Sequence, residues 1–315
     1  MKNSPRTGKT LISLTVATLI LTACGGGTGD SGNTSAAGST NGSLPSSQLA
    51  ASVSLGHQLP AIANKPTGNL FLAQIFTSDN GDPTDGPAGQ DAGAYRLTFN
   101  ESFDGPLDTA TWNTERTGGG NATTNYSTSG GALNIWPERG SDGNFFDRTL
   151  DTEGRFAQKY GYFEIEAKLP KGKGAWPAFW LFNQLGERRP EIDIMEAYPG
   201  GESPWSAPGA DGTTTATMYA PVVWNDSTSR AGYGKIATPD LAAGFHKYGV
   251  KWEPNRITFY FDGIEGYSID AALSDPMYII LDLWFGSASG SPDASTPTGA
   301  SNAFAINYVK AWQHR

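Results

Sequence analysis

The sequence is poor in several features that would place it in other protein classes. Its 315 residues include a single cysteine, so no disulfide can form within the chain. Only 17% of the residues are charged, which is too few for a chain that stays unfolded through its own charge. The sequence shows no internal repeat and no long stretch with the apolar period of a helix. These absences favour a folded protein built mainly from strands.

Turn-forming and aromatic residues are abundant instead. The chain has 40 Gly, 20 Pro, 9 Trp and 12 Tyr, a composition that suits an all-β protein with an aromatic-lined surface. The net charge is −9. Because a strongly acidic protein repels nucleic acid and anionic polymers, we expect no nucleic-acid partner and a neutral substrate.

The first residues resemble an export signal. Lys2, Arg6 and Lys9 precede an apolar run over residues 11–21, which is too short for a full membrane span and has the length of a secretory signal. Without these three cations the rest of the chain carries a charge of −12. The sole cysteine, Cys24, follows directly on Leu-Thr-Ala, as it does in the signals of bacterial lipoproteins.

That resemblance divides the chain into three parts. It implies that residues 1–23 are a signal peptide, that Cys24 is lipidated, and that the protein is exported and anchored at the outer membrane or the cell surface. Residues 24–92 begin with a Gly/Ser/Thr/Asn-rich stretch, which predicts a flexible tether, and continue into a segment of ambiguous character. Residues 93–315 are expected to form the folded domain.

Short strands are predicted throughout the folded domain. Apolar and polar residues alternate over residues 160–169, and residues 175–182 form a mostly apolar strand. Residues 256–261 followed by Asp-Gly indicate a strand and a hairpin turn, and further strands are expected at 277–285 and 305–312. Regularly spaced strands without helices predict a β-sandwich.

Three acidic residues lie close together in the sequence Glu-Ile-Asp-Ile-Met-Glu at residues 191–196. Side chains alternate between the two faces of a strand, so Glu191 and Asp193 share one face. Glu196 would point to the other face, and we expect a β-bulge around Met195 to return it to the acidic one.

Crowded carboxylates suit the hydrolysis of glycosidic bonds. Their charges raise one another's pKa, and this chemistry needs one carboxylate that attacks and one that stays protonated. Four strand steps of about 3.3 Å place the backbones of the two glutamates roughly 13 Å apart, whereas retaining chemistry needs carboxyl groups about 5–5.5 Å apart. Strand curvature, the bulge and the long side chains must close this gap. A metal-binding acidic strand or a solvated edge is the alternative, which the apolar residues between the acids disfavour.

The acidic hexapeptide is similar to the signature of glycoside hydrolase family 16 in its bulged form, Glu-x-Asp-x-x-Glu. The resemblance extends, in the expected order, through residues 97–112, 159–182, 245–263 and 306–313. It implies an all-β, concanavalin-like β-jelly-roll sandwich of two antiparallel sheets with a concave substrate cleft. It also implies that the reaction retains the anomeric configuration.

By position in this signature, Glu191 matches the nucleophile, Glu196 the acid/base, and Asp193 the residue that tunes the pair. The resemblance implies no metal and no cofactor in the reaction. A structural calcium is left open because no ligand set can be assigned. The chain departs from the family at Arg188-Arg189-Pro190, where many members have Gly or Ser, and this bears on the substrate.

Tryptophans are the expected sugar-binding residues. Trp176 and Trp180 fall on one face of their strand by alternation, and the resemblance places both beside the catalytic strand. Trp284 is a third candidate. Trp252 and Trp312 are expected in the core.

The sequence therefore predicts a monomeric, retaining endo-glycosidase that acts on a polysaccharide, β-1,3 or mixed β-1,3/1,4 glucan. One alternative is a hydrolase or transglycosylase of another polymer on the same fold, such as a galactan or an exopolysaccharide. Another is a carbohydrate-binding module, which would not need two crowded glutamates.

Overall fold

The computed structural model describes residues 86–114, 123–186 and 188–315. The expected signal peptide, the lipidated Cys24 and nearly all of the expected tether lie outside these residues. Those features stay predictions, which labelling of Cys24 with a fatty acid would test. Within the described residues no helix is both long and apolar enough to cross a membrane.

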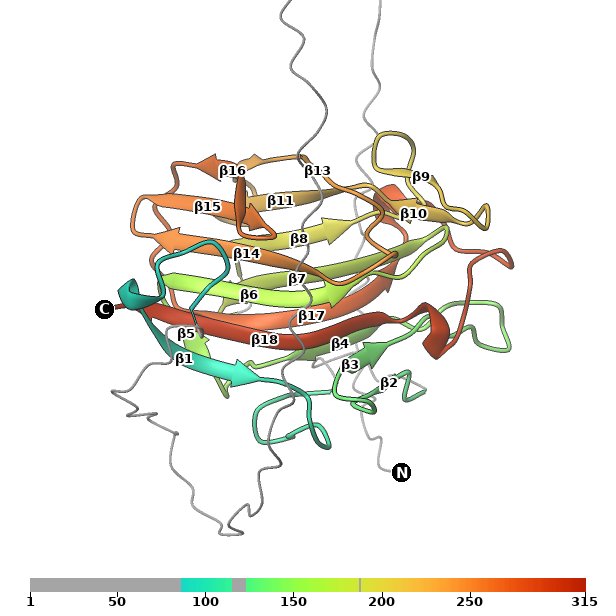
Figure 1. The fold of residues 1–315 in the computed structure, drawn as a ribbon, viewed down its shortest axis with the longest axis horizontal. Coiled ribbons are helices and arrows are strands. Elements are labelled where there is room, and N and C mark those ends of the chain that lie inside the picture. The colour runs from blue at the N-terminus through green and yellow to red at the C-terminus, as the bar shows by residue number, and fades with distance from the viewer. Residues whose placement is uncertain (1–85, 115–122, 187) are drawn as a thin grey trace, which may run out of the picture. The chain divides into compact units, whose positions relative to one another are not determined.

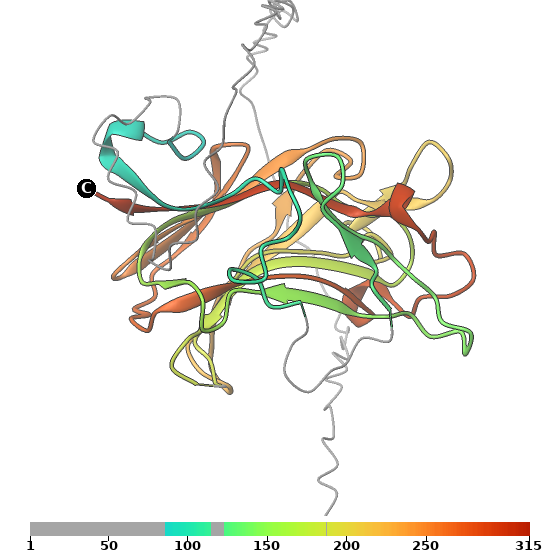
Figure 2. The same ribbon diagram turned by 90° about the horizontal axis from the view of Figure 1, so that it is seen from below.

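Two antiparallel sheets form the two layers of the protein (Figures 1 and 2). The first sheet has the spatial order β16 (Ile264–Ile269), β15 (Arg256–Phe261), β14 (His246–Glu253), β6 (Gly161–Lys168), β18 (Phe304–His314), β3 (Leu133–Ile135) and β2 (Tyr126–Ser127), with β1 (Tyr95–Glu101) also paired to β18.

The second sheet carries the acidic strand at its centre. Its order is β12 (Arg230–Tyr233), β11 (Met218–Trp224), β8 (Glu191–Ala197), β7 (Ala175–Asn183), β17 (Met277–Phe285) and β4 (Arg148–Asp151), with β13 (Ile236–Ala237) on β11 and β5 (Ala157–Gln158) on β17. A separate hairpin pairs β9 (Ser206–Pro208) with β10 (Thr214–Ala216). The only helices in the described part of the chain are the 3-10 turns η1 (Ala92–Ala94), η2 (Ser287–Ser289) and η3 (Ala300–Asn302).

The predicted fold class is thus confirmed, and so are the predicted strands. The expected strand at 256–261 is β15, and the one at 277–285 is β17. The other three expected strands match β6, β7 and β18 to within two residues at each end. β6 starts at Gly161, which has a φ of 109° and whose missing side chain would lie 2.0 Å from the Trp312 carbonyl oxygen, so only glycine fits there.

The main core fills the space between the sheets. Side chains that alternate along the central strands point into it, among them Phe179 of β7, Ile192 of β8 and Trp252 of β14, all fully buried. Trp252 confirms its expected core position. Burial of such large apolar side chains on both layers is what holds the two sheets together.

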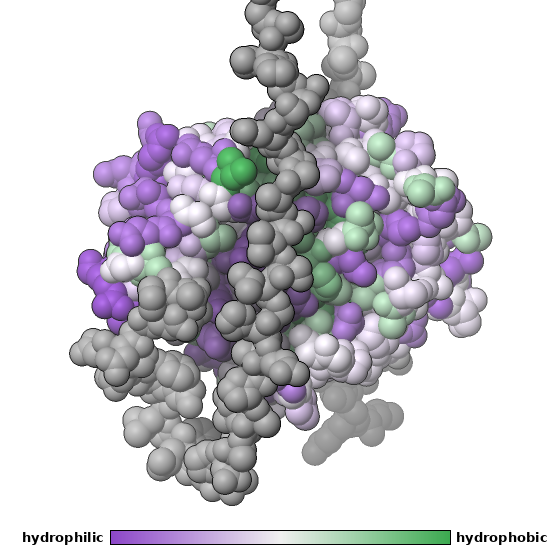
Figure 3. Space-filling model, viewed as in Figure 1, coloured by the Kyte–Doolittle hydropathy of each residue, from purple (hydrophilic) through white to green (hydrophobic). Residues whose placement is uncertain are grey.

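A second apolar cluster lies on the outer face of the first sheet, around Tyr162 and Trp312. Trp312 is therefore buried as expected, but in this outer cluster rather than between the sheets. Figure 3 shows this face, on which hydrophilic residues predominate at the left edge and hydrophobic residues are visible among hydrophilic ones on the right. Ala88, near the end of the expected tether, donates its backbone N–H to Glu164 of β6.

Candidate active site

A β-bulge in β8 brings the three acids onto one face. Asp193 lies opposite Trp180 on β7, but Met195 lies opposite the adjacent residue Phe179, so β8 holds one extra residue at this point. The same shift occurs against β11. The bulge predicted around Met195 is therefore confirmed. Ile194 and Met195 both pack into the core between the sheets, and this allows Glu196 to return to the acidic face.

We call the outer face of the second sheet the carboxylate face. Beside the acids it carries, by strand register, Trp176, Ala178, Trp180 and Phe182 of β7, Tyr278, Ile280, Asp282 and Trp284 of β17, and Ala220, Val222 and Trp224 of β11. Glu191 and Asp193 are almost completely buried, with exposed fractions of 7% and 5%, and Glu196 is half-buried. The carboxylates are thus withdrawn from bulk water while the face itself remains outside the main core.

The local environment favours a proton on Glu196. Burial, followed by the charge of Glu191, raises the pKa of Glu196 to about 7. Hydrogen bonds from Trp176 and Tyr198 act in the opposite direction, and the Trp176 Nε1–H donates to Glu196 Oε1 over 3.1 Å. The influence of Glu191 shows that the two glutamates interact, although they are five positions apart in the chain.

Asp193 lies between the two glutamates and also favours a proton. Burial is the largest cause of its raised pKa, followed by the charges of Glu191 and Glu196, while Arg189 opposes the shift. A buried Asp282 on β17 adds to the negative potential. Several carboxyls that lie close together cannot all ionise without a large free-energy cost, so this cluster keeps protons at pH values where isolated carboxyls have already released theirs.

Glu191 has a cationic partner. The Arg189 Nε–H donates to Glu191 Oε2 and an N–H on Nη2 donates to Oε1, each over 3.0 Å. A bidentate pair of this kind stabilises the ionised carboxylate and fixes its plane. The two glutamates therefore lie in different surroundings, one ion-paired and one that retains its proton up to about pH 7.

The three predicted tryptophans meet on the carboxylate face. The Trp284 ring contacts Trp176 edge-on at 5.6 Å between centroids and Trp180 at 6.2 Å. Trp176 and Trp284 are half-buried, whereas Trp180 is only 7% exposed and donates its Nε1–H to Asp282 over 3.3 Å. The expected sugar contacts stay predictions, and Trp176 and Trp284 offer more ring surface for them than Trp180.

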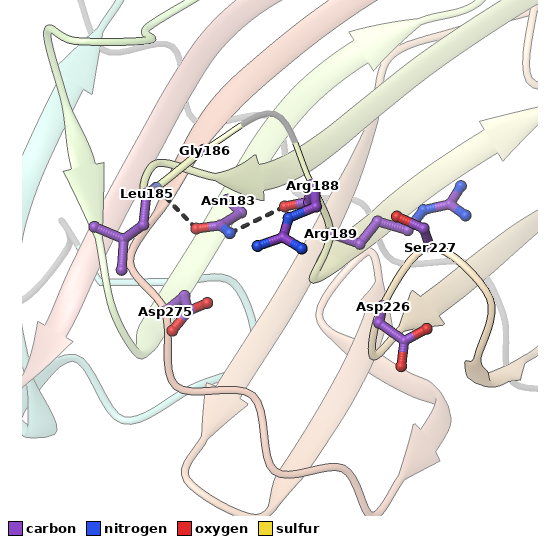
Figure 4. A pocket seen from close by; sticks show the side chains of 8 residues that line it. All are labelled: Asn183, Leu185, Gly186, Arg188, Arg189, Asp226, Ser227 and Asp275. Carbon is purple, nitrogen blue, oxygen red and sulfur yellow. Dashed lines mark hydrogen bonds between the residues drawn. The ribbon is translucent and has the colours of Figure 1, made fainter.

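A cavity of about 380 Å³ adjoins the acidic strand at its Glu191 end. Figure 4 shows its lining, which comes from the loops that follow β7 and β11 and from the segment before β17. Asn183 holds the first of these loops, because its Nδ2–H donates to the Arg188 carbonyl oxygen over 3.0 Å and its Oδ1 accepts from the Leu185 N–H over 2.8 Å.

Sequence reasoning missed several residues of this site. Arg189 appears among the sequence-based expectations only as part of a departure from the family pattern, and Tyr198 is not among the candidates. The departure from the family pattern just before Glu191 was the available signal for Arg189. Tyr198 lies two positions after Glu196, which was a signal that both could face the same side.

No group of three or more His, Cys, Asp or Glu side chains placed to hold a metal ion occurs within residues 86–114, 123–186 and 188–315.

Comparison with known proteins agrees with this architecture. The sequence model of "Glycosyl hydrolases family 16" matches residues 113–310, which include the whole carboxylate strand. The chain belongs to glycosyl hydrolases family 16. The family 16 chain is 34% identical to the "Endo-1,3-1,4-beta-glycanase EglC" of Rhizobium meliloti over 197 residues, which cover 59% of this chain and 39% of that protein.

Two further relatives are informative. The chain is 26% identical to the "Glucan endo-1,3-beta-glucosidase A1" of Niallia circulans, with 84% of this chain and 46% of that protein covered. The chain thus spans less than half the length of the Rhizobium meliloti and Niallia circulans relatives. The crystal structure of a laminarinase from Flavobacterium sp. UMI-01 matches with a TM-score of 0.56 at 26% identity and covers 69% of this chain and 100% of that one.

Proposed function

We propose that the protein is a retaining endo-glycosidase that cleaves β-1,3 or mixed β-1,3/1,4 glucan. The observation that carries this proposal is the difference in surroundings between the two glutamates of the bulged strand. Glu191 is ion-paired with Arg189, whereas Glu196 has a pKa of about 7 and stays protonated below it. Retaining hydrolysis needs one carboxyl in each state.

The mechanism follows from these two states. Glu196 gives its proton to the glycosidic oxygen while an oxygen of Glu191 attacks the anomeric carbon, so the bond to the leaving sugar breaks and a glycosyl ester forms. A water molecule then attacks the same carbon, passes its proton to Glu196, and returns the bonding electrons to Glu191. Asp193 lies between the two, and because burial and the charges of Glu191 and Glu196 raise its own pKa, it shares in the proton balance of the cluster.

The choice of β-glucan rests on three supports. The relatives named above are called a β-1,3-1,4-glycanase, an endo-1,3-β-glucosidase and a laminarinase. The tryptophans of the carboxylate face suit the apolar faces of sugar rings. The acidic net charge of the chain disfavours the approach of sulfated or uronic polymers.

A panel of polysaccharides tests the substrate. Laminarin, lichenan, agarose and carrageenan are incubated with the protein side by side at low salt, and the release of reducing ends is measured. We expect faster cleavage of at least one glucan than of either galactan. Faster cleavage of a galactan would refute the glucan assignment.

The stereochemistry is tested separately by proton NMR of the first product. A retaining enzyme releases the β-anomer before it equilibrates. Initial release of the α-anomer would show that Glu191 does not form a glycosyl ester.

A further inference from the structure

The ion pair between Arg189 and Glu191 has a geometry that bears on the two steps of the reaction. The guanidinium uses two N–H groups, one for each carboxylate oxygen, and both contacts measure 3.0 Å. Each carboxylate oxygen has two lone pairs, so each keeps one that the guanidinium does not occupy. The two hydrogen bonds from Arg189 therefore fix the plane of the Glu191 carboxylate and still leave its oxygens free to attack an anomeric carbon.

Arg189 is itself held from two directions. Its guanidinium carbon lies 3.6 Å from the centroid of the Trp224 ring, which makes a close cation–π stack. Trp224 lies directly opposite Glu191 in the pairing of β11 with β8, so the ring, the guanidinium and the carboxylate form one layer on the carboxylate face. The loop that carries Arg189 is in turn anchored by Asn183, through its hydrogen bond to the Arg188 carbonyl oxygen.

The adjacent arginine does not share this arrangement. In Figure 4 the side chains of Arg188 and Arg189 diverge from the loop, and Arg188 lines the cavity beside the strand. Within the described residues Arg188 has no ion pair with a carboxylate at 4.0 Å or less. The two neighbours thus have the same charge and the same loop, but only Arg189 contacts the nucleophile.

We propose that Arg189 is a positioning residue that makes Glu191 a better leaving group, and so speeds the breakdown of the glycosyl-enzyme relative to its formation. This inference rests on the proposed function, because it assumes that Glu191 forms the glycosyl ester.

The charge balance of the two steps explains the asymmetry. In the first step the negative charge of Glu191 disappears as its oxygen bonds to the anomeric carbon, so the ion pair with Arg189 is lost on the way to the ester. In the second step water attacks, the ester bond breaks, and the charge returns to Glu191 beside a guanidinium that Trp224 has kept in place. Arg189 therefore stabilises the transition state of the second step relative to the ester that precedes it.

Arg189 also acts on the acid/base. Its positive charge is one of the factors that lower the pKa of Glu196, against the larger effects of burial and of Glu191. Once Glu191 is esterified, its charge no longer supports the proton on Glu196, while the charge of Arg189 remains. The pKa of Glu196 then falls, so Glu196 is held in the ionised form that takes the proton of the attacking water.

The test compares Arg189→Met with Arg188→Met as the matched control, in the full-length protein. The probe is 2,4-dinitrophenyl β-laminaribioside, whose good leaving group makes formation of the ester fast. Because a hydrogen-bonded charge pair is lost, we expect Arg189→Met to lower kcat about 10- to 100-fold. We expect kcat/KM to be unchanged or higher, so that KM falls together with kcat. Intact-protein mass spectrometry should then find the laminaribiosyl adduct accumulating in this variant, and Arg188→Met should match the wild type in all three measurements.

A structural role would give a different result. If Arg189 only supported the loop, Arg189→Met would lower kcat/KM without any adduct, and this would overturn the inference. Equal behaviour of the two methionine variants would overturn it as well. Arg189→Lys provides a second measurement should the methionine variant fail to fold, because a lysine keeps the charge but lacks the planar fork. It should show the same pattern to a smaller extent, and a loss of kcat/KM without adduct in this variant would again refute the role.

Failure of the proposed function is distinguishable from failure of the inference. A wild-type protein that releases no dinitrophenol from the laminaribioside and no reducing ends from laminarin or lichenan would refute both. An active wild type with indistinguishable Arg189 and Arg188 variants would refute only the role of Arg189.

Discussion

Each of the two outer faces of the sandwich holds a glutamate with a raised pKa, but the groups that surround the two glutamates differ. On the outer face of the first sheet, Glu164 is 2% exposed, and burial is the largest cause of its shift. It accepts a hydrogen bond from the Tyr308 hydroxyl over 2.7 Å and one from the Ala88 N–H over 3.1 Å. On the carboxylate face, Glu196 owes its shift first to burial and then to the charge of Glu191.

This difference shows which feature marks an active site. The charges that act on Glu164 come from Lys247 and Lys310, and both lower its pKa, so the site relieves the cost of a buried carboxylate. The carboxylate face does the reverse, because it adds like charges to groups that are already buried. Such an arrangement costs folding free energy, and carboxyls perturbed in this way cluster at functional sites, whereas a raised pKa through burial alone is not diagnostic.

The largest expected effect separates the two glutamates by activity. Glu196→Gln removes the proton donor, and loss of general acid/base catalysis typically costs about 10²- to 10⁴-fold in rate. Glu164→Gln should leave kcat/KM on β-glucan close to that of the wild type, because no described contact joins Glu164 to the carboxylate face. Reducing-end assays on both purified variants, with circular dichroism to confirm folding, make the comparison.

The comparison would fail in either of two ways. Near-normal turnover by Glu196→Gln would show that another group donates the proton. A folded Glu164→Gln variant with a loss as large as that of Glu196→Gln would show that the two faces are coupled.

A smaller effect concerns the tuning of Glu196 by its hydrogen-bond partners. The hydrogen bond from the Trp176 Nε1–H lowers the pKa of Glu196, so Trp176→Phe should raise this pKa. The alkaline limb of the pH profile is expected near pH 7 in the wild type, and it should move to higher pH in this variant. Loss of one hydrogen bond to the charged form corresponds to roughly 0.5–1 pH unit. Trp180→Phe is the matched control, since the Trp180 Nε1–H donates to Asp282 instead. Equal shifts in both variants, measured as kcat/KM against pH, would attribute the effect to the aromatic cluster in general.

The smallest expected effect is on stability. Because the folded pKa of Glu164 is raised above its ordinary value of 4.5, the native state holds a proton that the unfolded chain releases there. The stability associated with this proton is complete below about pH 4.5 and is lost as the pH rises through the raised folded value. Glu164→Gln should flatten this part of the dependence of unfolding free energy on pH, although it costs about 1 kcal/mol at low pH because an amide cannot accept both donors.

Urea unfolding at a series of pH values measures this dependence, with Glu166→Gln on the same strand as the control. Glu166 is only half-buried and accepts its hydrogen bond from Asn307 over 2.9 Å. An unchanged slope in Glu164→Gln would show that Glu164 has the same pKa in the folded and unfolded states, and would contradict the raised folded pKa.

Much of the carboxylate face could be predicted from the sequence, because its signals are local. The alternation around Glu191 and the extra residue before Glu196 together predict the bulge, and alternation alone places Trp176 and Trp180 on one face. The surroundings of these residues depend on contacts between distant segments, which local patterns do not record. Trp312 is an example, because its burial in the outer cluster of the first sheet depends on Tyr95 and Tyr260 from other strands.

The ion pair of Arg189 illustrates a different limit. Arg189 lies two positions before Glu191, and this spacing places two side chains on one face only where both residues belong to the same strand. Arg189 reaches the carboxylate because it precedes β8, in a loop that Asn183 shapes, and because Trp224 of another strand offers a ring for it to stack on. Neither condition can be recognised before the sheet order is known.

The bulge in β8 also has a consequence for how this strand tolerates changes of length. Ile194 and Met195 are consecutive and both point into the core, whereas a regular strand would place only one of them there. Deletion of Met195 would restore a regular strand and would still leave all three carboxylates on one face, whereas deletion of Ile192 would turn Glu191 away from Asp193. The same set of carboxylates is therefore compatible with two strand lengths, and the spacing between Asp193 and Glu196 can vary by one residue without reversing the face on which any of the acids lies.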